Sequence, residues 1–250
     1  MELTFEISID SVRSAQNAEK AGANRVELCA SLIEGGTTPS PGMIKTVRKY
    51  TSLDMFVIIR PRGGDFLYTE EEFEVMCNDI IFARENGADG IVSGALTREG
   101  EIDTEKTKKM IELSSPLPFT FHRAFDMCRD PYKALEQLKD LNVTRILTSG
   151  LMPSADKGAE LLSELVKKAG DKIIIMPGAG VNADNIKFLI EKTGAKEYHF
   201  SAKRSFPSEM EYFNKNITMG RADNADEYSI MFSDIEIIKN VISKAKEVFS

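Results

Sequence analysis

The sequence Ile58-Ile-Arg-Pro-Arg-Gly-Gly-Asp-Phe66 is the stretch around which the rest of the chain can be ordered. The apolar run over residues 55–59 is typical of a buried strand. Pro61 has no N–H and ends the strand pairing, and the glycines after Arg62 allow a tight turn. The strand therefore delivers Arg60 and Arg62 at its exit, where two forked guanidinium groups suit a carboxylate, a phosphate or another planar anion. Arginines that acidic neighbours hold for structural reasons alone fit the same residues.

The composition excludes several classes of protein. The 250 residues are 42% hydrophobic and 28% charged, as in an ordinary globular chain with a sizeable core. The net charge of −7 argues against nucleic acid or an anionic membrane as the main partner. No apolar run approaches the ~20 residues that span a bilayer, and the N-terminus lacks the features of a signal peptide. Three widely spaced cysteines fit a reducing cytosol. We therefore expect a cytoplasmic protein with one domain, residues 1–250.

Eight strand-like segments alternate with helical patterns. We expect strands at residues 3–8, 25–29, 55–59, 89–93, 117–122, 144–148, 172–176 and 196–201. This alternation predicts a parallel sheet, and eight units predict a closed (β/α)₈ or TIM barrel, with an open doubly wound sheet as the main alternative. Gly-Ala pairs at Gly22, Gly87 and Gly194 fall between a helix end and the next strand, as expected for left-handed C-caps. Residues 205–232 form a long polar excursion before the final helix, typical of a lid, an interface or disorder.

Polar residues are expected to meet at one end of this barrel. Alternate strand residues face the interior of such a fold, and its active face lies at the carboxyl ends of the strands. If the large apolar side chains face the helices, the following residues face inward: Glu6, Ser8, Glu27, Cys29, Arg60, Thr120, His122, Thr148, Glu197, His199 and Ser201. Burying so many ionisable groups is costly unless they pair or serve a ligand. We predict a binding or catalytic pocket here, with a structural polar plug as the alternative.

One interpretation of this pocket is catalytic. His122 would act as general acid or base, with Glu27 or Glu6 as its partner. The Gly178-Ala-Gly180 turn would expose N–H groups to an anion, although a plain tight turn explains it equally well. The expected substrate-binding residues are Arg60, Arg62, Arg123, Thr148, Gly178, Gly180, His199 and Ser201. The substrate would be a small anionic ligand.

The cysteines support a second, metal-binding interpretation. Cys77 is expected to pack within a helix, Cys128 lies on the loop after the fifth strand and could be exposed, and Cys29 lies at the mouth near Glu27. No close Cys-x-x-Cys or His-Glu-x-x-His spacing indicates zinc. Cu(I) prefers thiolate, thioether and imidazole donors. These cysteines, Met127 and the two histidines could supply such donors only if the fold brings them together.

Several long motifs resemble the CutC family. They are Arg25-Val-Glu-Leu-Cys29 with Glu34-Gly-Gly-Thr-Thr-Pro-Ser40, Ile59-Arg-Pro-Arg-Gly-Gly-Asp-Phe66, Thr120-Phe-His-Arg-Ala-Phe-Asp126 and Leu147-Thr-Ser-Gly150. The likeness runs from about Glu6 to the end of the chain, and its motifs occur in the family's order.

The resemblance implies a cytoplasmic TIM barrel that forms a homo-oligomer and acts in copper homeostasis. It also implies Cu(I) bound through cysteines, one of which matches Cys29, whereas the other falls at Ser8 in this chain. A site made of two cysteines therefore cannot form as in the family. The alternative function is that of a metal-independent barrel enzyme, or a remnant of one, acting on a small phosphorylated or carboxylated metabolite.

Overall fold

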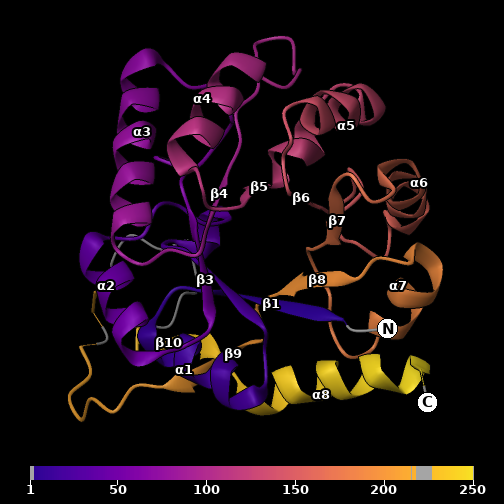
Figure 1. The fold of residues 1–250 in the computed structure, drawn as a ribbon. Coiled ribbons are helices and arrows are strands. Elements are labelled where there is room, and N and C mark those ends of the chain that lie inside the picture. Colours follow the sequence, from indigo (N-terminus) through magenta and orange to yellow (C-terminus); the bar gives the residue numbers. More distant parts are fainter. Residues whose placement is uncertain (1–2, 215, 218–226, 250) are drawn as a thin grey trace.

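A ring of parallel strands surrounded by helices makes up most of the molecule (Figure 1). The computed structural model describes residues 3–214, 216–217 and 227–249. The barrel strands are β1 (Thr4–Ile9), β2 (Arg25–Leu28), β3 (Asp54–Ile58), β4 (Gly90–Ser93), β5 (Phe119–Phe121), β6 (Arg145–Thr148), β7 (Ile174–Pro177) and β8 (Glu197–Phe200). The helices are α1 (Val12–Ala21), α2 (Pro41–Tyr50), α3 (Glu70–Glu85), α4 (Thr104–Ser114), α5 (Pro131–Asp140), α6 (Ala159–Ala169), α7 (Ile186–Thr193) and α8 (Ile235–Lys246). Short 3₁₀ turns are η1 (Leu32–Glu34), η2 (Arg123–Met127) and η3 (Glu247–Phe249).

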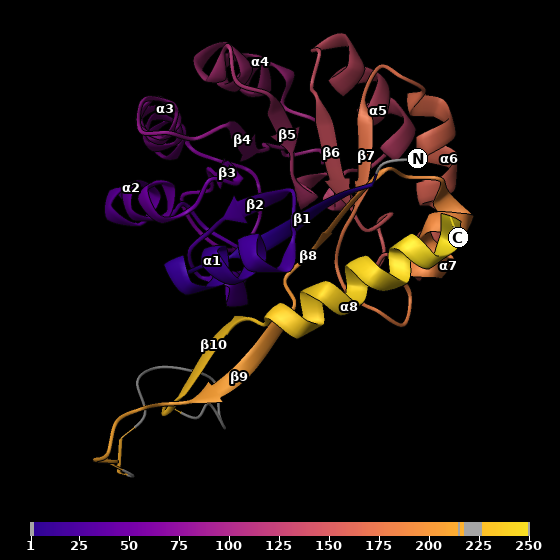
Figure 2. The ribbon, with the colours of Figure 1, turned by 60° about the horizontal axis from the view of Figure 1, so that its bottom comes forward.

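The strand order confirms the predicted barrel. The sheet runs β7-β6-β5-β4-β3-β2-β1-β8, and each hydrogen-bonded pair in it is parallel. β7 and β8 lie side by side at the remaining seam, so the ring is nearly closed (Figure 2). The open doubly wound sheet is excluded, because its edge strands would lie at opposite ends of the sheet.

The register of β1 decides which polar residues meet. This strand lies between β2 and β8, and Glu6 is paired in register with both Arg25 and His199. One inward position further along, Ser8 is paired with Glu27. Since residues in register lie at the same height in a parallel sheet, the fold assembles these side chains in two successive levels inside the ring.

The helix ends follow local sequence signals. Thr69 and Glu72 form a reciprocal capping box at the start of α3. The predicted left-handed glycines are confirmed, with φ of +83° at Gly22, +94° at Gly87 and +68° at Gly194. A residue with a β-carbon is strained in this conformation, so glycine allows each helix to end sharply before the next strand.

The apolar core lies between the strands and the helices. Phe5 and Ile7 on β1 and Val26 and Leu28 on β2 are buried there, together with helix residues such as Leu162. Burial of apolar surface is the main driving force for folding, worth roughly 25 cal/mol for each Å². Because these side chains face outward to the helices, the intervening residues of the same strands face the inside of the barrel.

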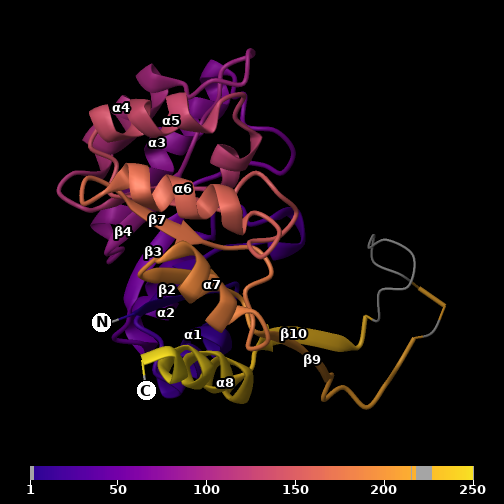
Figure 3. The same ribbon diagram turned by 90° about the vertical axis from the view of Figure 1, so that its right-hand side faces the viewer.

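The polar excursion predicted over residues 205–232 begins and ends in short strands, which the sequence did not indicate. β9 (Lys203–Pro207) pairs with β10 (Ser229–Ser233) as an antiparallel hairpin that projects from the barrel beside α8 (Figures 2 and 3). The rings of Phe206 and Phe232 stack at 3.8 Å, with the guanidinium of Arg13 over Phe232. Residues 215 and 218–226 of the excursion lie outside the described residues.

Within the described part of the chain, no helix has both the length and the apolar composition that a membrane span requires.

Candidate functional site

A pocket of about 290 Å³ opens at the carboxyl ends of the barrel strands. Its lining combines apolar residues such as Ile58, Phe66 and Leu147 with the polar ends of several strands. The predicted site residues that line it are Glu27, Arg60, His122, Arg123, Gly180, His199 and Ser201. Residues from widely separated parts of the sequence therefore share one cavity, in the place where such barrels carry their functional groups.

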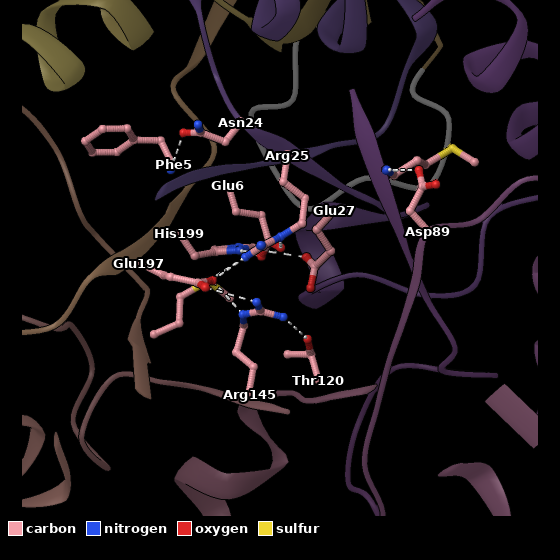
Figure 4. Close-up of polar contacts among 12 residues, drawn as sticks. Phe5, Glu6, Asn24, Arg25, Glu27, Asp89, Thr120, Arg145, Glu197 and His199 are labelled. Carbon is pink, nitrogen blue, oxygen red and sulfur yellow. Dashed lines mark hydrogen bonds and ion pairs between the residues drawn. The ribbon is translucent and has the colours of Figure 1, made fainter. Parts of the chain in front are cut away.

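Beneath the pocket lies a group of four charged side chains, which we call the ionic layer: Glu6, Arg25, Arg145 and Glu197. Arg25 contacts Glu6 at 2.5 Å and Glu197 at 2.7 Å (Figure 4). Arg145 contacts the two oxygens of Glu197 at 2.6 and 3.0 Å and also donates to the Thr120 hydroxyl. Two guanidinium groups thus face two carboxylates, and the formal charges balance in the interior.

The two arginines of the ionic layer were missed from the sequence. Arg25 is two residues before Glu27, which lines the pocket, so both face inward. Arg145 is likewise two residues before Leu147, another residue of the pocket lining. The alternation of β2 and β6 could have identified both. The inward position of Arg145 also corrects the prediction for Thr148, which falls on the opposite face of β6. The Thr148 hydroxyl donates to Asp126 Oδ1 and does not line the pocket.

Above the ionic layer, two potential ligand residues, Cys29 and His199, approach Glu27. We call Glu27, Cys29 and His199 the mouth cluster. The Cys29 thiol donates to Glu27 Oε2 at 3.3 Å, and His199 Nε2 lies 3.8 Å from the same oxygen. The other ring nitrogen of His199, Nδ1, contacts Glu6 Oε1 at 2.7 Å. His199 therefore joins the ionic layer to the mouth cluster, as Figure 4 shows for the two glutamates.

Burial and neighbouring charges shift the pKa values of these groups in different directions. Burial favours a neutral Glu6, but Arg25 and the hydrogen bond with His199 lower the pKa of Glu6 to about 2. Burial raises the pKa of Glu27, and the adjacent Glu6 carboxylate adds to this effect against the opposing influence of His199. Burial favours a neutral His199, but the two carboxylates raise its pKa overall. Burial and Glu27 raise the pKa of the Cys29 thiol well above its ordinary value.

His122 lies on the same pocket without the carboxylate partner predicted for it. Its Nδ1 accepts a hydrogen bond from the backbone N–H of Ala124 at 3.2 Å. Glu6 and Glu27 instead face His199, so the histidine–carboxylate pairing belongs to the other histidine of the chain. Burial, together with the positive charge of Arg60, lowers the pKa of His122 to about 3.

The two arginines of the opening motif have separate positions. Arg60 lines the pocket, whereas Arg62 turns outward and pairs with Glu72 at 2.5 Å and Asp65 at 3.1 Å. The structure therefore does not bring them together as a clamp. Pro61 and the glycine turn after it direct the two side chains apart, and the capping-box glutamate of α3 takes the second guanidinium.

The glycine turn after β7 contributes differently at its two ends. Gly180, with φ of +75°, lines the pocket together with Ala179. A β-carbon at Gly178 would come within 2.5 Å of the Leu147 side chain, so close packing accounts for this glycine. Cys128, which the sequence left as a candidate for exposure, is buried under η2, and burial raises its pKa to about 12.

Comparison with known proteins places this architecture among its relatives. The family model described as "CutC family" matches residues 3–204. The chain belongs to the CutC family.

Members of this family from distant organisms share most of the chain's length. A CutC family protein of Parabacteroides distasonis is 50% identical over 243 residues, which cover 97% of this chain and 100% of the relative. The mouse copper homeostasis protein cutC homolog is 46% identical over 244 residues, covering 98% of this chain and 90% of the relative. The solved structure of a CutC protein from Streptococcus agalactiae is 36% identical with a TM-score of 0.76, covering 80% of this chain and 98% of that one.

Proposed function

We propose that this CutC protein serves copper homeostasis by binding Cu(I) at the barrel mouth, with Cys29 as a ligand. The observation that carries the proposal is the approach of a thiol and an imidazole to one carboxylate oxygen. Cys29 Sγ lies 3.3 Å and His199 Nε2 lies 3.8 Å from Glu27 Oε2. Sulfur and imidazole nitrogen are the donors that Cu(I) prefers.

The surroundings of His199 support its role as a ligand. Metal-binding histidines usually direct their second ring nitrogen to a carboxylate, which orients the ring. Glu6 takes this position against Nδ1 at 2.7 Å and leaves Nε2 facing Glu27. Glu6, Glu27 and His199 also form a candidate metal-holding group, with one potential ligand atom from each lying within 4.8 Å of the others, and Cys29 is not a member of this group.

Glu27 provides an unsatisfied acceptor for a cation. Its Oε1 is buried and has no hydrogen-bond partner among the described residues. An unpaired polar atom in the interior is costly, and a positively charged ion beside it offsets that cost. This open acceptor therefore favours a cation bound beside Glu27.

Ser8 leaves the mouth cluster with Cys29 as its one thiol. Ser8 Oγ lies 3.8 Å from Cys29 Sγ and 3.3 Å from Glu27 Oε2, so it faces the mouth cluster directly. A hydroxyl is a poor ligand for a soft ion such as Cu(I). We therefore assign the second soft donor to His199, where the family resemblance expected a second cysteine.

Copper binding at this cluster displaces the thiol proton of Cys29. Because the pKa of the Cys29 thiol is raised well above its ordinary value, the free protein holds the sulfur protonated at neutral pH. A metal binds the thiolate, so the incoming ion must displace this proton. The Glu27 carboxylate that accepts the S–H hydrogen bond is placed to receive it.

A Cu(I) titration against a chromophoric competitor tests the proposal. Cys29→Ser should weaken stoichiometric Cu(I) binding by roughly 100-fold or more, because it removes the thiolate donor. Cys77→Ser is the matched control, since Cys77 is a half-buried residue of α3 outside the pocket. Stoichiometric, tight Cu(I) binding by a variant without any of its three cysteines would refute the proposal.

We further propose a cytoplasmic location and assembly as a homo-oligomer. The three cysteines are free, which suits a reducing compartment. Exposed apolar side chains on the hairpin, among them Ile230 and Met231, suit contact with a second copy. Fractionation of cells and the solution mass of the intact chain test these two statements.

A further inference from the structure

Arg60 is a buried cation that has no carboxylate partner in the described part of the chain. Its side chain is 5% exposed, and its guanidinium donates to the backbone carbonyls of Glu34 at 2.7 Å, Gly36 at 2.9 Å and Gly64 at 2.8 Å. No Asp or Glu of the described residues forms an ion pair with it. Arg25 and Arg145, which are buried to the same degree, each contact a glutamate.

The described residues offer no carboxylate that compensates this positive charge. Carbonyl oxygens satisfy hydrogen bonds but carry no formal charge, and a charge buried without a counter-ion is strongly unfavourable. Tyr68 does not supply the missing charge, because burial raises its pKa to about 12 and keeps its hydroxyl neutral. Arg123 and Lys203 also line the pocket, but each pairs with an aspartate.

His122 presents a second unused donor to the same pocket. Because Nδ1 accepts the Ala124 N–H, the proton of the neutral ring resides on Nε2. This Nε2 is buried and has no hydrogen-bond partner among the described residues, and the whole side chain is 3% exposed. Phe66 holds the two residues together, with the Arg60 guanidinium 4.9 Å and the His122 ring 5.0 Å from its ring centre.

We propose that Arg60 and His122 form a subsite for the oxyanion group of a small organic molecule. A carboxylate or a phosphate supplies the counter-charge for Arg60 and the acceptor for His122 Nε2, and both groups line the pocket at its mouth. The volume of about 290 Å³ is far larger than a single metal ion requires. The subsite uses other side chains of the same pocket than the mouth cluster does and does not require copper, so each proposal has its own test.

A thermal-shift experiment on the copper-free protein tests the subsite with two probes, inorganic phosphate and citrate. A ligand that binds only the folded state stabilises it by RT ln(1 + L/Kd) at a free ligand concentration L, so the Tm rises with ligand concentration. We expect at least one probe to raise the Tm of the wild type, with the stronger probe identifying phosphate or carboxylate as the preferred group. Arg60→Met should need at least tenfold more of this probe to reach the same rise in Tm.

Arg62→Gln is the matched control, because Arg62 belongs to the same turn but pairs with Glu72 outside the pocket. It should respond to the probes as the wild type does. Absence of any shift in the wild type, or an unchanged response in Arg60→Met, overturns the proposal.

A second measurement keeps the proposal testable if Arg60→Met fails to fold. The chain has only two histidines, so the ring proton resonances of His122 and His199 can be assigned by single substitutions. Titration of the wild-type, copper-free protein with the stabilising probe should shift the His122 resonance more than that of His199. A saturating probe that leaves the His122 resonance in place contradicts the subsite.

Discussion

The ionic layer and the mouth cluster use the same strands and similar residues, yet they differ in how completely their charges are paired. In the ionic layer, Arg25 and Arg145 share the carboxylates of Glu6 and Glu197 at 2.5–3.0 Å. One level higher, an oxygen of Glu27 has no partner among the described residues. The ionic layer has the paired charges of a structural network. The mouth cluster has an acceptor without a partner among the described residues, as a ligand-binding site does.

The difference shows that buried charge alone does not identify a functional site. Both groups are buried and both perturb pKa values, as structural ion networks and active sites each do. What separates them is the balance of donors and acceptors at each level. The same criterion distinguishes Arg60, which lacks a carboxylate, from the arginines of the ionic layer.

The largest expected effect comes from breaking the ionic layer. Glu197→Gln removes the carboxylate that Arg25 and Arg145 share and leaves a buried positive charge unpaired. We expect a loss of about 3–5 kcal/mol in the free energy of unfolding, measured by urea denaturation. Glu160→Gln, which breaks the exposed pair with Lys192, is the control and should change stability little. Equal small losses in both variants would show that the ionic layer is not structural.

A smaller effect should come from Glu6, which belongs to both levels. Glu6→Gln weakens the contact with Arg25 and replaces the carboxylate that orients His199 by a neutral amide. We expect Cu(I) affinity to fall by about 10–100-fold, as for other residues that support a metal ligand. The competition titration measures this, and urea denaturation of the same variant measures the loss of stability. An unchanged Cu(I) affinity would show that the ionic layer does not influence copper binding, and it would contradict a role for His199 as a copper ligand.

A pH dependence of the free energy of unfolding should distinguish the two histidines. The pKa of His122 falls from 6.5 to about 3 on folding, so the unfolded chain binds this proton more readily. Stability from this group is complete above pH 6.5 and is lost as the pH falls towards 3, by at most about 1.4 kcal/mol per pH unit. His199 has a raised pKa, so its contribution is complete below pH 6.5 and is lost as the pH rises through the folded value.

Urea denaturation between pH 4 and pH 9 can resolve these opposite contributions. His122→Gln should flatten the acid side of the stability profile, and His199→Gln should flatten the neutral-to-alkaline side. If His122→Gln leaves the acid slope unchanged, His122 is not the buried neutral group that its contacts indicate.

The sequence was sufficient for the barrel and for the inward faces of β1, β2 and β8. Strict alternation of apolar and polar residues identified Glu6, Glu27 and His199 as inward-facing before their register was known. Their convergence depends on register, because Glu6 must lie opposite both Arg25 and His199. Alternation within one strand carries no information about its height relative to the next.

The sequence could not predict which charged residues would pair with one another, because several partners compete for each side chain. Arg60 and Arg62 are two residues apart and were expected to act together, but a capping glutamate of α3 takes Arg62. His122 and His199 both occupy inward positions at strand ends. Only the three-dimensional arrangement shows that the glutamates face His199. On β6, Thr148 was assigned inward because Arg145 was overlooked as the inward residue of that strand.

The most direct test of the copper site is the NMR response of the two histidines to Cu(I). One equivalent of this diamagnetic ion should shift the ring proton resonances of His199 strongly and leave those of His122 nearly unchanged, and Cys29→Ser should abolish the shift at the same copper concentration. A His199 resonance that does not move, or an equal response in Cys29→Ser, would contradict the assignment of Cu(I) to Cys29 and His199.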